Sequence, residues 1–195
     1  MTLDVMGGME KRELRQVFGT FATGVTVVTT RSDDGVAHGT TVNAFAAVSV
    51  DPPLVQITMT RASRAAGYLE GAPFAINILS LEQVDAARHF AGKVVDPEPE
   101  WTLDGNVPVL TGNAATLKCR PWYIYDGGDP IIVVGEVMAM DITQREPLVF
   151  FGGEFRTMGR RVEGNRWDHS GADSESGWFA GSSFFRPLHD APKYR

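Results

Sequence analysis

The sequence lacks the features that mark several large classes of protein. It has one cysteine, Cys119, among 195 residues, so an intrachain disulfide and a cysteine-based metal cluster are excluded. No uninterrupted apolar run reaches membrane-spanning length, and residues 1–8 show no basic flank followed by an apolar run, as a secretory signal would. The formal net charge of -6 disfavours a nucleic-acid partner and an anionic membrane surface. These absences favour a cytoplasmic protein.

The usual catalytic motifs are also missing. The chain contains no Ser-His-Asp order, no HExxH and no GxxxxGK[ST] loop, and its four histidines, His38, His89, His169 and His189, lack metal-ligand spacing. We therefore expect no metal site and no catalytic side chain, and we expect Cys119 to be a small buried strand residue. Such a protein can still be an enzyme if a bound cofactor carries the reaction.

Length and composition indicate one globular domain followed by an extension. A hydrophobic content of 43% and a charged content of 22% are typical of a folded domain with a sizeable core. After Gly159 the sequence becomes polar and glycine-rich, so we divide it into a domain over residues 1–159 and a C-terminal extension over residues 160–195. The extension holds four closely spaced aromatic residues, which predict that it docks on the domain or on a dimer partner: Trp178, Phe179, Phe184 and Phe185.

Periodicity predicts a mainly β domain with short helices. An apolar stripe formed by Leu14, Val17, Phe18 and Phe21 indicates an amphipathic helix from Arg12 that ends at Gly24 and packs on the core. Further short helices are expected at 63–69 and 80–92, and a solvated loop at 94–106. Strands are expected at 25–30, in two runs within 36–50, and at 54–60, 74–79, 108–110, 114–125, 131–142, 147–151 and 154–158.

The stretch from Gly39 to Pro53 is the strongest candidate for a binding site. It sets small polar side chains between flat apolar ones, so a planar ligand could approach the backbone and bond its free N–H and C=O groups. An ordinary strand–turn–strand with hydroxyls facing water would have the same composition. The polar members are Thr40, Thr41, Asn43 and Ser49, and the apolar ones include Val42, Ala44 and Val50.

This stretch resembles the signature of the flavin reductase-like family. The similar blocks are Gly39-Thr-Thr-Val-Asn-Ala-Phe and Val48-Ser-Val-Asp-Pro-Pro-Leu, with Phe90-Ala-Gly, Gly128-Asp129 and Pro147-Leu-Val-Phe-Phe-Gly-Gly following in the family's order. The likeness covers roughly residues 12 to 159. It implies a Greek-key split β-barrel that binds FMN or FAD and takes NADH or NADPH as co-substrate. It further implies a homodimer with the flavin near the interface, which supplies reduced flavin to a partner monooxygenase.

The resemblance also implies which residues hold the flavin. The hydroxyl- and base-bearing turn at Arg61, Ser63 and Arg64 would hold the phosphate, and the end of the helix at 80–92 would form a wall of the site. The implied cofactor-binding residues are Thr40, Thr41, Val42, Asn43, Ala44, Ser49, Val50, Thr60, Ser63, Arg64, Phe90, Ala91 and Gly92.

One departure from the family bears on the second substrate. Family reductases carry Gly-Asp-His near the nicotinamide, whereas this chain has Gly128-Asp129-Pro130, and proline offers no donor there. Either a tail residue, His169 or His189, replaces that histidine, or the nicotinamide is bound differently or poorly. The second case would make the chain a flavin-binding storage or electron-carrier protein with little NAD(P)H oxidation. An interaction protein with no cofactor is a third class, which failure to bind flavin would favour. The sequence does not choose FMN over FAD, or NADH over NADPH.

Overall fold

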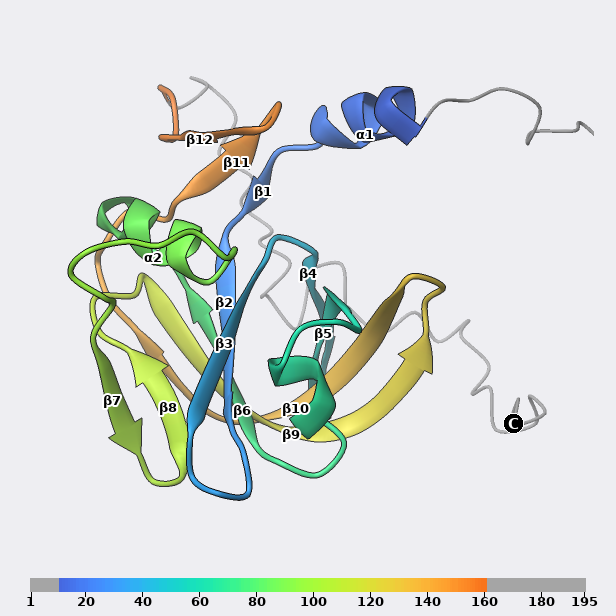
Figure 1. Ribbon diagram of the computed structural model, residues 1–195, viewed down its shortest axis with the longest axis vertical. Helices are drawn as coiled ribbons and strands as arrows, with labels where there is room; N and C mark the ends of the chain where they lie inside the picture. The colour runs from blue at the N-terminus through green and yellow to red at the C-terminus, as the bar shows by residue number, and fades with distance from the viewer. Residues whose placement is uncertain (1–10, 161–195) are drawn as a thin grey trace, which may run out of the picture.

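The computed structural model describes residues 11–160, which form a mainly antiparallel β structure with short helices (Figure 1). The helical elements are α1 (Lys11–Gly19), η1 (Ala65–Tyr68), η2 (Leu81–Gln83) and α2 (Val84–His89), where η marks a 3₁₀ helix. The strands are β1 (Thr23–Gly24), β2 (Thr26–Arg31), β3 (Ala37–Val42), β4 (Phe45–Val50), β5 (Pro53–Thr60), β6 (Phe74–Ile78), β7 (Trp101–Asp104), β8 (Val107–Leu110), β9 (Ala115–Asp126), β10 (Pro130–Ile142), β11 (Val149–Phe151) and β12 (Glu154–Arg156). The predicted C-terminal extension lies outside the described residues.

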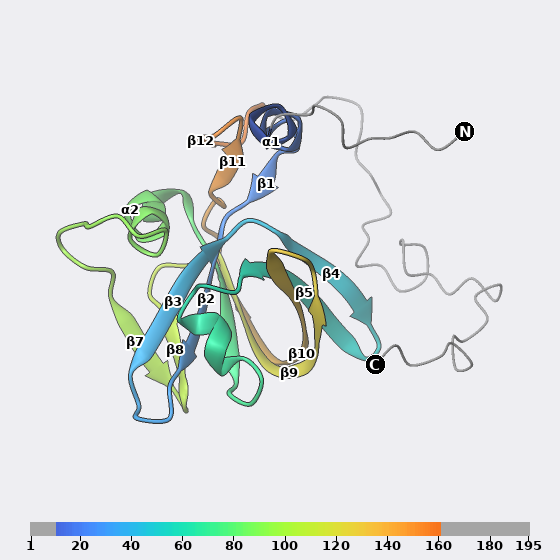
Figure 2. The ribbon, with the colours of Figure 1, turned by 45° about the vertical axis from the view of Figure 1, so that its right-hand side comes forward.

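One seven-stranded sheet forms the body of the domain, in the order β3-β2-β6-β9-β10-β5-β4. Its two edge strands, β3 and β4, are consecutive in the chain and joined only by Asn43 and Ala44. The sheet therefore curls until its edges meet at one corner, as the two ribbon views show (Figures 1 and 2). This arrangement agrees with the predicted split β-barrel.

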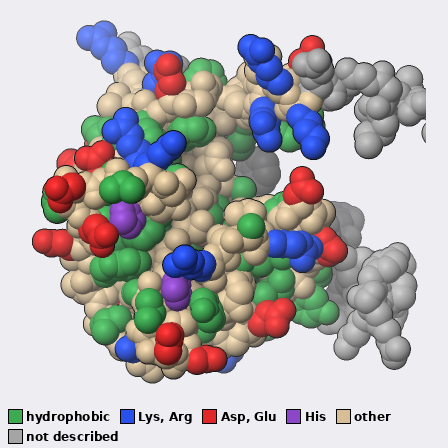
Figure 3. Space-filling model, viewed as in Figure 1, with side chains coloured by type: hydrophobic (Ala, Val, Ile, Leu, Met, Phe, Trp, Pro, Cys, Tyr) green, Lys and Arg blue, Asp and Glu red, His purple; other side chains and the backbone are tan. Residues whose placement is uncertain are grey.

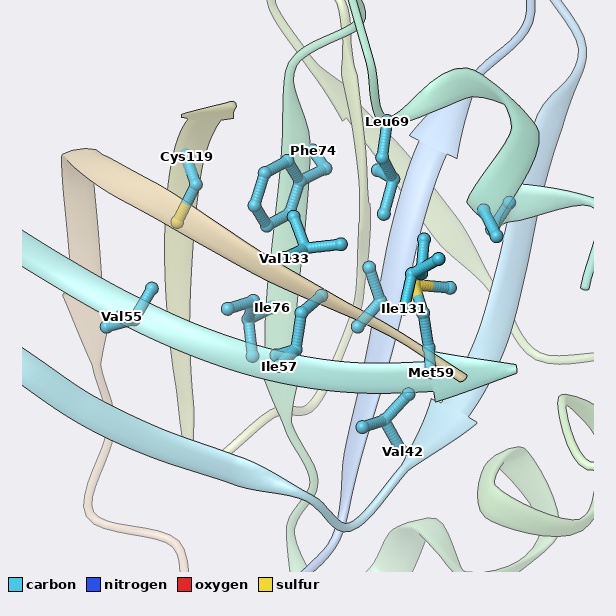
Figure 4. Packing of buried hydrophobic residues seen from close by; sticks show 13 residues of the cluster. Val42, Val55, Ile57, Met59, Leu69, Phe74, Ile76, Cys119, Ile131 and Val133 are labelled. Carbon is cyan, nitrogen blue, oxygen red and sulfur yellow. The ribbon is translucent and has the colours of Figure 1, made fainter. Parts of the chain in front are cut away.

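The core fills the inside of the curl because alternate residues of each strand point there. On β5 the alternation is the predicted one, with Val55, Ile57 and Met59 buried. Figure 4 shows these three side chains packed in one cluster with Phe74 and Ile76 of β6 and with Val133, the pairing partner of Ile57 on the neighbouring β10. Cys119 lies in the same cluster, buried in a strand as predicted, and burial raises the pKa of its thiol to about 12, which disfavours the thiolate at neutral pH.

A second buried feature is polar and lies on the other face of β6. The Asn77 Nδ2 group donates to the Val27 carbonyl and to Thr29 Oγ1, both at 2.9 Å. Its Oδ1 accepts from the Leu110 N–H at 3.0 Å and from Asn113 Nδ2 at 2.9 Å. Asn77 is fully buried, so this amide fastens the β7–β8 hairpin to the main sheet by satisfying groups that water cannot reach.

The first helix differs from its prediction. It ends at Gly19 rather than Gly24, because Thr23 and Gly24 form β1 in a small sheet with β11 and β12. Its polar side, including Arg12 and Gln16, faces the β11–β12 turn. The apolar stripe consequently points away from the domain, and the prediction that it packs on the core was wrong.

Other boundaries also moved. The predicted loop at 94–106 contains β7, which pairs with β8. The helix predicted at 63–69 is the short η1, and the one predicted at 80–92 is η2 followed by α2. Gly92 ends that segment with φ of +88°, a left-handed conformation that suits glycine. The strands at β9 and β10 match their predicted ranges to within one residue.

Candidate functional site

A hollow of about 280 Å³ lies between β3, α2 and the small β11–β12 sheet. Its walls are mostly apolar, with two polar side chains, Thr41 and Asn43. Ala91 also lines it, so three of the predicted flavin-binding residues meet in one place. The remaining lining residues are Val25, Ala87, Phe150 and Phe155.

The end of α2 is fixed against β3 by hydrogen bonds from Thr41. The Thr41 N–H donates to the Phe90 carbonyl at 3.1 Å, and Thr41 Oγ1 donates to the Ala87 carbonyl at 2.8 Å. Gly39, two residues earlier on the same face, lies beneath the Phe90 ring. The signature Gly-Thr-Thr therefore holds the α2 wall of the hollow in place.

The other predicted residues of this stretch do not reach the hollow. Val42 is buried in the main core on the opposite face of β3, and Thr40 shares that face with its pairing partner Val28. The Ala44 carbonyl accepts from the Thr58 N–H at 2.9 Å, which closes the corner. Ser49 and Val50 lie at the far end of β4, about 17 Å along the strand from Phe45 at ~3.3 Å per residue.

The predicted phosphate turn joins β5 to η1. The Ser63 N–H donates to the Thr60 carbonyl at 3.1 Å, and Ser63 Oγ accepts from the Ala66 N–H at 3.2 Å. Because η1 has only four residues, it offers no helix terminus of useful length for an anion. Arg61 bonds Asp126 at 2.6 Å, so Arg64 and the Ser63 hydroxyl are the groups of this turn left to meet a phosphate.

The predicted nicotinamide turn, Asp129 and Pro130, lies at the tip of the β9–β10 hairpin. Pro130 pairs with Thr60, which places this tip next to the phosphate turn. Figures 1 and 2 show the tip on the side of the domain away from α2. Within a single chain, the hollow and the nicotinamide turn therefore lie on different sides of the domain.

The hollow suits a flavin ring in the chemistry of its walls. An isoalloxazine needs flat apolar contact on its faces and a few donors at its edge. Ala87, Ala91 and the two phenylalanines supply the former and Asn43 the latter, whereas both donors of Thr41 are taken by α2 and its hydroxyl oxygen can only accept. Buried nearby, Thr23 Oγ1 and His89 Nδ1 have no hydrogen-bond partner among residues 11–160. His89 is thus half-buried, with its Nδ1 unpaired among the described residues.

Sequence reasoning missed the two aromatic walls contributed by β11 and β12. Phe150 and Phe155 stack edge to face with ring centroids 5.5 Å apart, and Arg88 of α2 lies over Phe155 at 6.0 Å. Phe150 stands inside the family-like block at 147–153, but Phe155 lies beyond it, and no local pattern connects either residue with β3.

Residues 11–160 contain neither a candidate metal site nor a candidate membrane-spanning helix. No cluster of histidine, cysteine or acidic residues within this range could hold a metal ion. None of the helices between Lys11 and Arg160 is both long enough and apolar enough to cross a bilayer.

Comparison with known proteins shows the family of the chain. The family model described as "Flavin reductase like domain" matches residues 18–159. The FMN reductase (NADH) SmoA of Agrobacterium fabrum is 40% identical over 161 residues, covering 80% of this chain and 91% of that protein. The NADH-dependent FAD reductase of Streptomyces globisporus is 38% identical over 157 residues, covering 75% and 85%.

Solved structures give the same result. The flavin reductase PheA2 superposes with a TM-score of 0.74 at 34% identity, covering 78% of this chain and 100% of that one. The Streptomyces globisporus NADH:FAD oxidoreductase SgcE6, solved with NAD and FAD fragments, has a TM-score of 0.72 at 38% identity, covering 77% and 93%. The chain therefore belongs to the flavin reductase like domain family and is a NAD(P)H-dependent flavin reductase.

Proposed function

We propose that this chain uses NADH to reduce a flavin held at the Thr41–Asn43–Ala91 hollow and delivers the reduced flavin to a separate monooxygenase. The observation that carries the site is the meeting of Thr41, Asn43 and Ala91 around one mostly apolar hollow. NADH is favoured because SmoA and the Streptomyces globisporus enzyme are both named as NADH-dependent. The partner is proposed because relatives such as HsaB of Rhodococcus jostii, 36% identical over 154 residues, are named as monooxygenase reductase subunits.

The side chains act by binding and positioning. Asn43 would donate to the edge of the flavin ring, and the Thr41 hydroxyl oxygen, whose hydrogen goes to Ala87, would accept from it. The phenylalanine and alanine walls would exclude water from the ring face, and Ser63 with Arg64 would hold the phosphate. The bound flavin supplies the hydride-accepting chemistry. The bonds from the Thr41 N–H and hydroxyl to carbonyls at the end of α2 keep the wall rigid, so that little reorganisation is needed when the ring binds.

The direct test is anaerobic mixing of the protein with flavin and each nicotinamide nucleotide. We expect the flavin absorbance to be lost with NADH and much more slowly with NADPH. Persistence of the absorbance with both nucleotides, in a protein that binds flavin, would support the storage or electron-carrier alternative. Histidines 169 and 189, which could replace the missing family histidine, lie outside the described residues.

Replacing Arg64 by glutamine should weaken flavin binding by about three- to tenfold, the usual size of one exposed charge contact to phosphate. Arg64 is exposed, and no ion pair is recorded for it within residues 11–160. The change should leave the turnover number at saturating flavin unaltered, because Arg64 has no part in hydride transfer. Flavin fluorescence titration and steady-state kinetics measure the two quantities.

The matched control is Arg145→Gln. Arg145 is also exposed and pairs with Glu82 at 3.7 Å, away from the β5–η1 turn. The Arg145→Gln substitution removes the same charge as Arg64→Gln and should leave flavin affinity unchanged. Equal losses in both variants would mean that Arg64 acts only through overall charge and not at the phosphate.

We also propose that two copies form a homodimer through α1. Val17, Phe18 and Phe21 are 64%, 65% and 77% exposed, which is unusual for an aligned apolar stripe. Figure 3 shows the α1 end, which carries basic side chains, standing beyond a notch in the surface. A second copy would cover the stripe and could bring its own hairpin tip to the hollow of the first.

Replacing Phe18 by glutamate should convert the dimer into monomers, because a charge in the middle of the stripe cannot be buried without a partner. Sedimentation velocity at micromolar concentration measures the change. The control is Gln16→Glu, which adds the same charge on the polar side of α1. A monomeric wild type, or a dimer that survives Phe18→Glu, would contradict this interface.

A further inference from the structure

Arg61 links two turns that are far apart in the sequence. Its Nη2 bonds Asp126 Oδ1 at 2.6 Å, and its Nε donates to the Gly128 carbonyl at 3.3 Å. Arg61 follows β5, whereas Asp126 and Gly128 belong to the tip of the β9–β10 hairpin. The Arg61 guanidinium thus connects the phosphate turn with the nicotinamide turn.

The hairpin tip is organised around the same carboxylate. Asp126 Oδ1 accepts from the Gly128 N–H at 2.9 Å, and the Gly127 N–H donates to the Pro130 carbonyl at 3.2 Å. The Gly128 N–H first, and then the Arg61 charge, lower the pKa of Asp126 from its ordinary value. The carboxylate is therefore ionised at neutral pH, as both bonds require.

Pro130 itself contributes little to holding the hairpin tip in place. It stands opposite Thr60 in the β5–β10 ladder, and its nitrogen carries no hydrogen to donate. Its side chain also has no polar group that could fix the turn. The Pro130 carbonyl accepts from the Gly127 N–H, but Pro130 has no N–H to donate in return, so the turn lacks the second main-chain bond of such a pair, and Arg61 holds the turn from the end of β5.

We propose that Arg61 is a positioning residue for the nicotinamide nucleotide, holding the Asp126–Pro130 turn against the end of β5. This inference rests on the proposed function and on the family resemblance that makes this turn the nicotinamide turn. In this role Arg61 does not serve as a flavin-phosphate ligand, because its Nε and Nη2 are engaged by the tip. Loss of the link makes the turn mobile, so part of the free energy of nucleotide binding is used to order the turn.

The test compares the wild type with Arg61→Gln, Arg61→Lys and Asp126→Asn, with Arg145→Gln as the control for losing an exposed ion pair. The pair is accessible, with side-chain exposures of 49% and 81%, so a moderate effect is expected. Arg61→Gln should raise the KM for NADH about three- to tenfold, with kcat and flavin affinity changed less than about twofold. Arg61→Lys should show an intermediate effect, because an ammonium cannot reproduce the forked contact.

Two readouts separate positioning from general destabilisation. In a double-mutant cycle, Arg61→Gln combined with Asp126→Asn should raise the KM for NADH no more than the stronger single change, because the two residues act as a pair. Hydrogen exchange of the turn at 126–130, measured by mass spectrometry without ligands, should accelerate in Arg61→Gln and not in Arg145→Gln.

The outcomes are distinguishable. An unchanged KM for NADH in Arg61→Gln, beside an active wild type, overturns the inference and leaves the proposed function standing. A rise in the flavin Kd with no change in the KM for NADH also overturns it and makes Arg61 a phosphate ligand. A wild type that binds flavin without oxidising NADH overturns the proposed function, and the inference with it.

Discussion

Replacing Asn77 by alanine is expected to lower the free energy of unfolding by about 2–4 kcal/mol, since buried groups that lose a hydrogen bond cost ~1–3 kcal/mol each. Four hydrogen bonds converge on the Asn77 amide, and the side chain is fully buried. The Leu110 N–H would lose the acceptor that holds it to the main sheet. Urea unfolding followed by circular dichroism measures the loss.

The matched control for this prediction is Asn106→Ala. Asn106 lies in the exposed turn between β7 and β8, so the same chemical change should cost less than about 0.5 kcal/mol. A similar small loss for Asn77→Ala would mean that water replaces the amide at little cost.

A titratable group at position 77 should make the loss of folding free energy depend on pH. In Asn77→Asp, burial would raise the folded-state pKa of the new carboxyl above its unfolded value of about 3.9. The folded protein would then bind more protons than the unfolded chain between those two pKa values. Stability relative to the wild type should therefore be better near pH 4 and fall as the pH rises.

The sequence predicted the sheet well because its strands are long and regular in pattern. The β9–β10 hairpin is marked by two β-branched and aromatic runs on either side of Gly127 and Gly128, and both runs appear within one residue of their predicted bounds. The β5 alternation likewise predicted its buried face, because the period of two is enforced by the geometry of a strand.

The position of α1 was not predictable from its own pattern. An amphipathic stripe indicates that a helix buries one face, but it does not say whether the covering surface belongs to the same chain. Here the turn between β11 and β12, more than 130 residues later, takes the polar side, and the Gly19 carbonyl accepts from the Gly152 N–H at 2.9 Å. Such a long-range contact leaves no trace in a local window.

For the site, the family-like motif located the β3 corner but not its surroundings. Thr41 and Asn43 face the hollow while Thr40 and Val42 face the core, which is the alternation of one strand and follows from the sequence once β3 is assigned. The phenylalanine walls depend on how β11 and β12 fold back, and the engagement of Arg61 depends on the register of β5 with β10. Both depend on tertiary contacts between segments far apart in the sequence, which local patterns do not reveal.

The largest effect on flavin binding should come from Gly39→Ala, at the first residue of the motif. A Cβ built on Gly39 would lie 2.7 Å from Phe90 Cδ1 and 2.8 Å from Cε1, closer than real Cβ contacts allow. The ring cannot simply swing away, because it packs edge to face on Trp101 at 5.1 Å, and its backbone carbonyl accepts from Thr41. The end of α2 must therefore shift, and the Ala91 wall of the hollow shifts with it.

We expect Gly39→Ala to cost about 1–3 kcal/mol of folding free energy, the usual cost of overpacking, and to raise the flavin Kd by about tenfold or more. Adding Phe90→Leu should restore much of the affinity, because it removes the ring that causes the clash. Gly67→Ala is the control, since a Cβ there meets no atom within 4 Å. If Gly39→Ala bound flavin like the wild type, the α2 wall would not belong to the flavin site. If Phe90→Leu restored stability but not affinity, Phe90 itself would contact the flavin, and the need for glycine at position 39 would be to bring that ring close to β3.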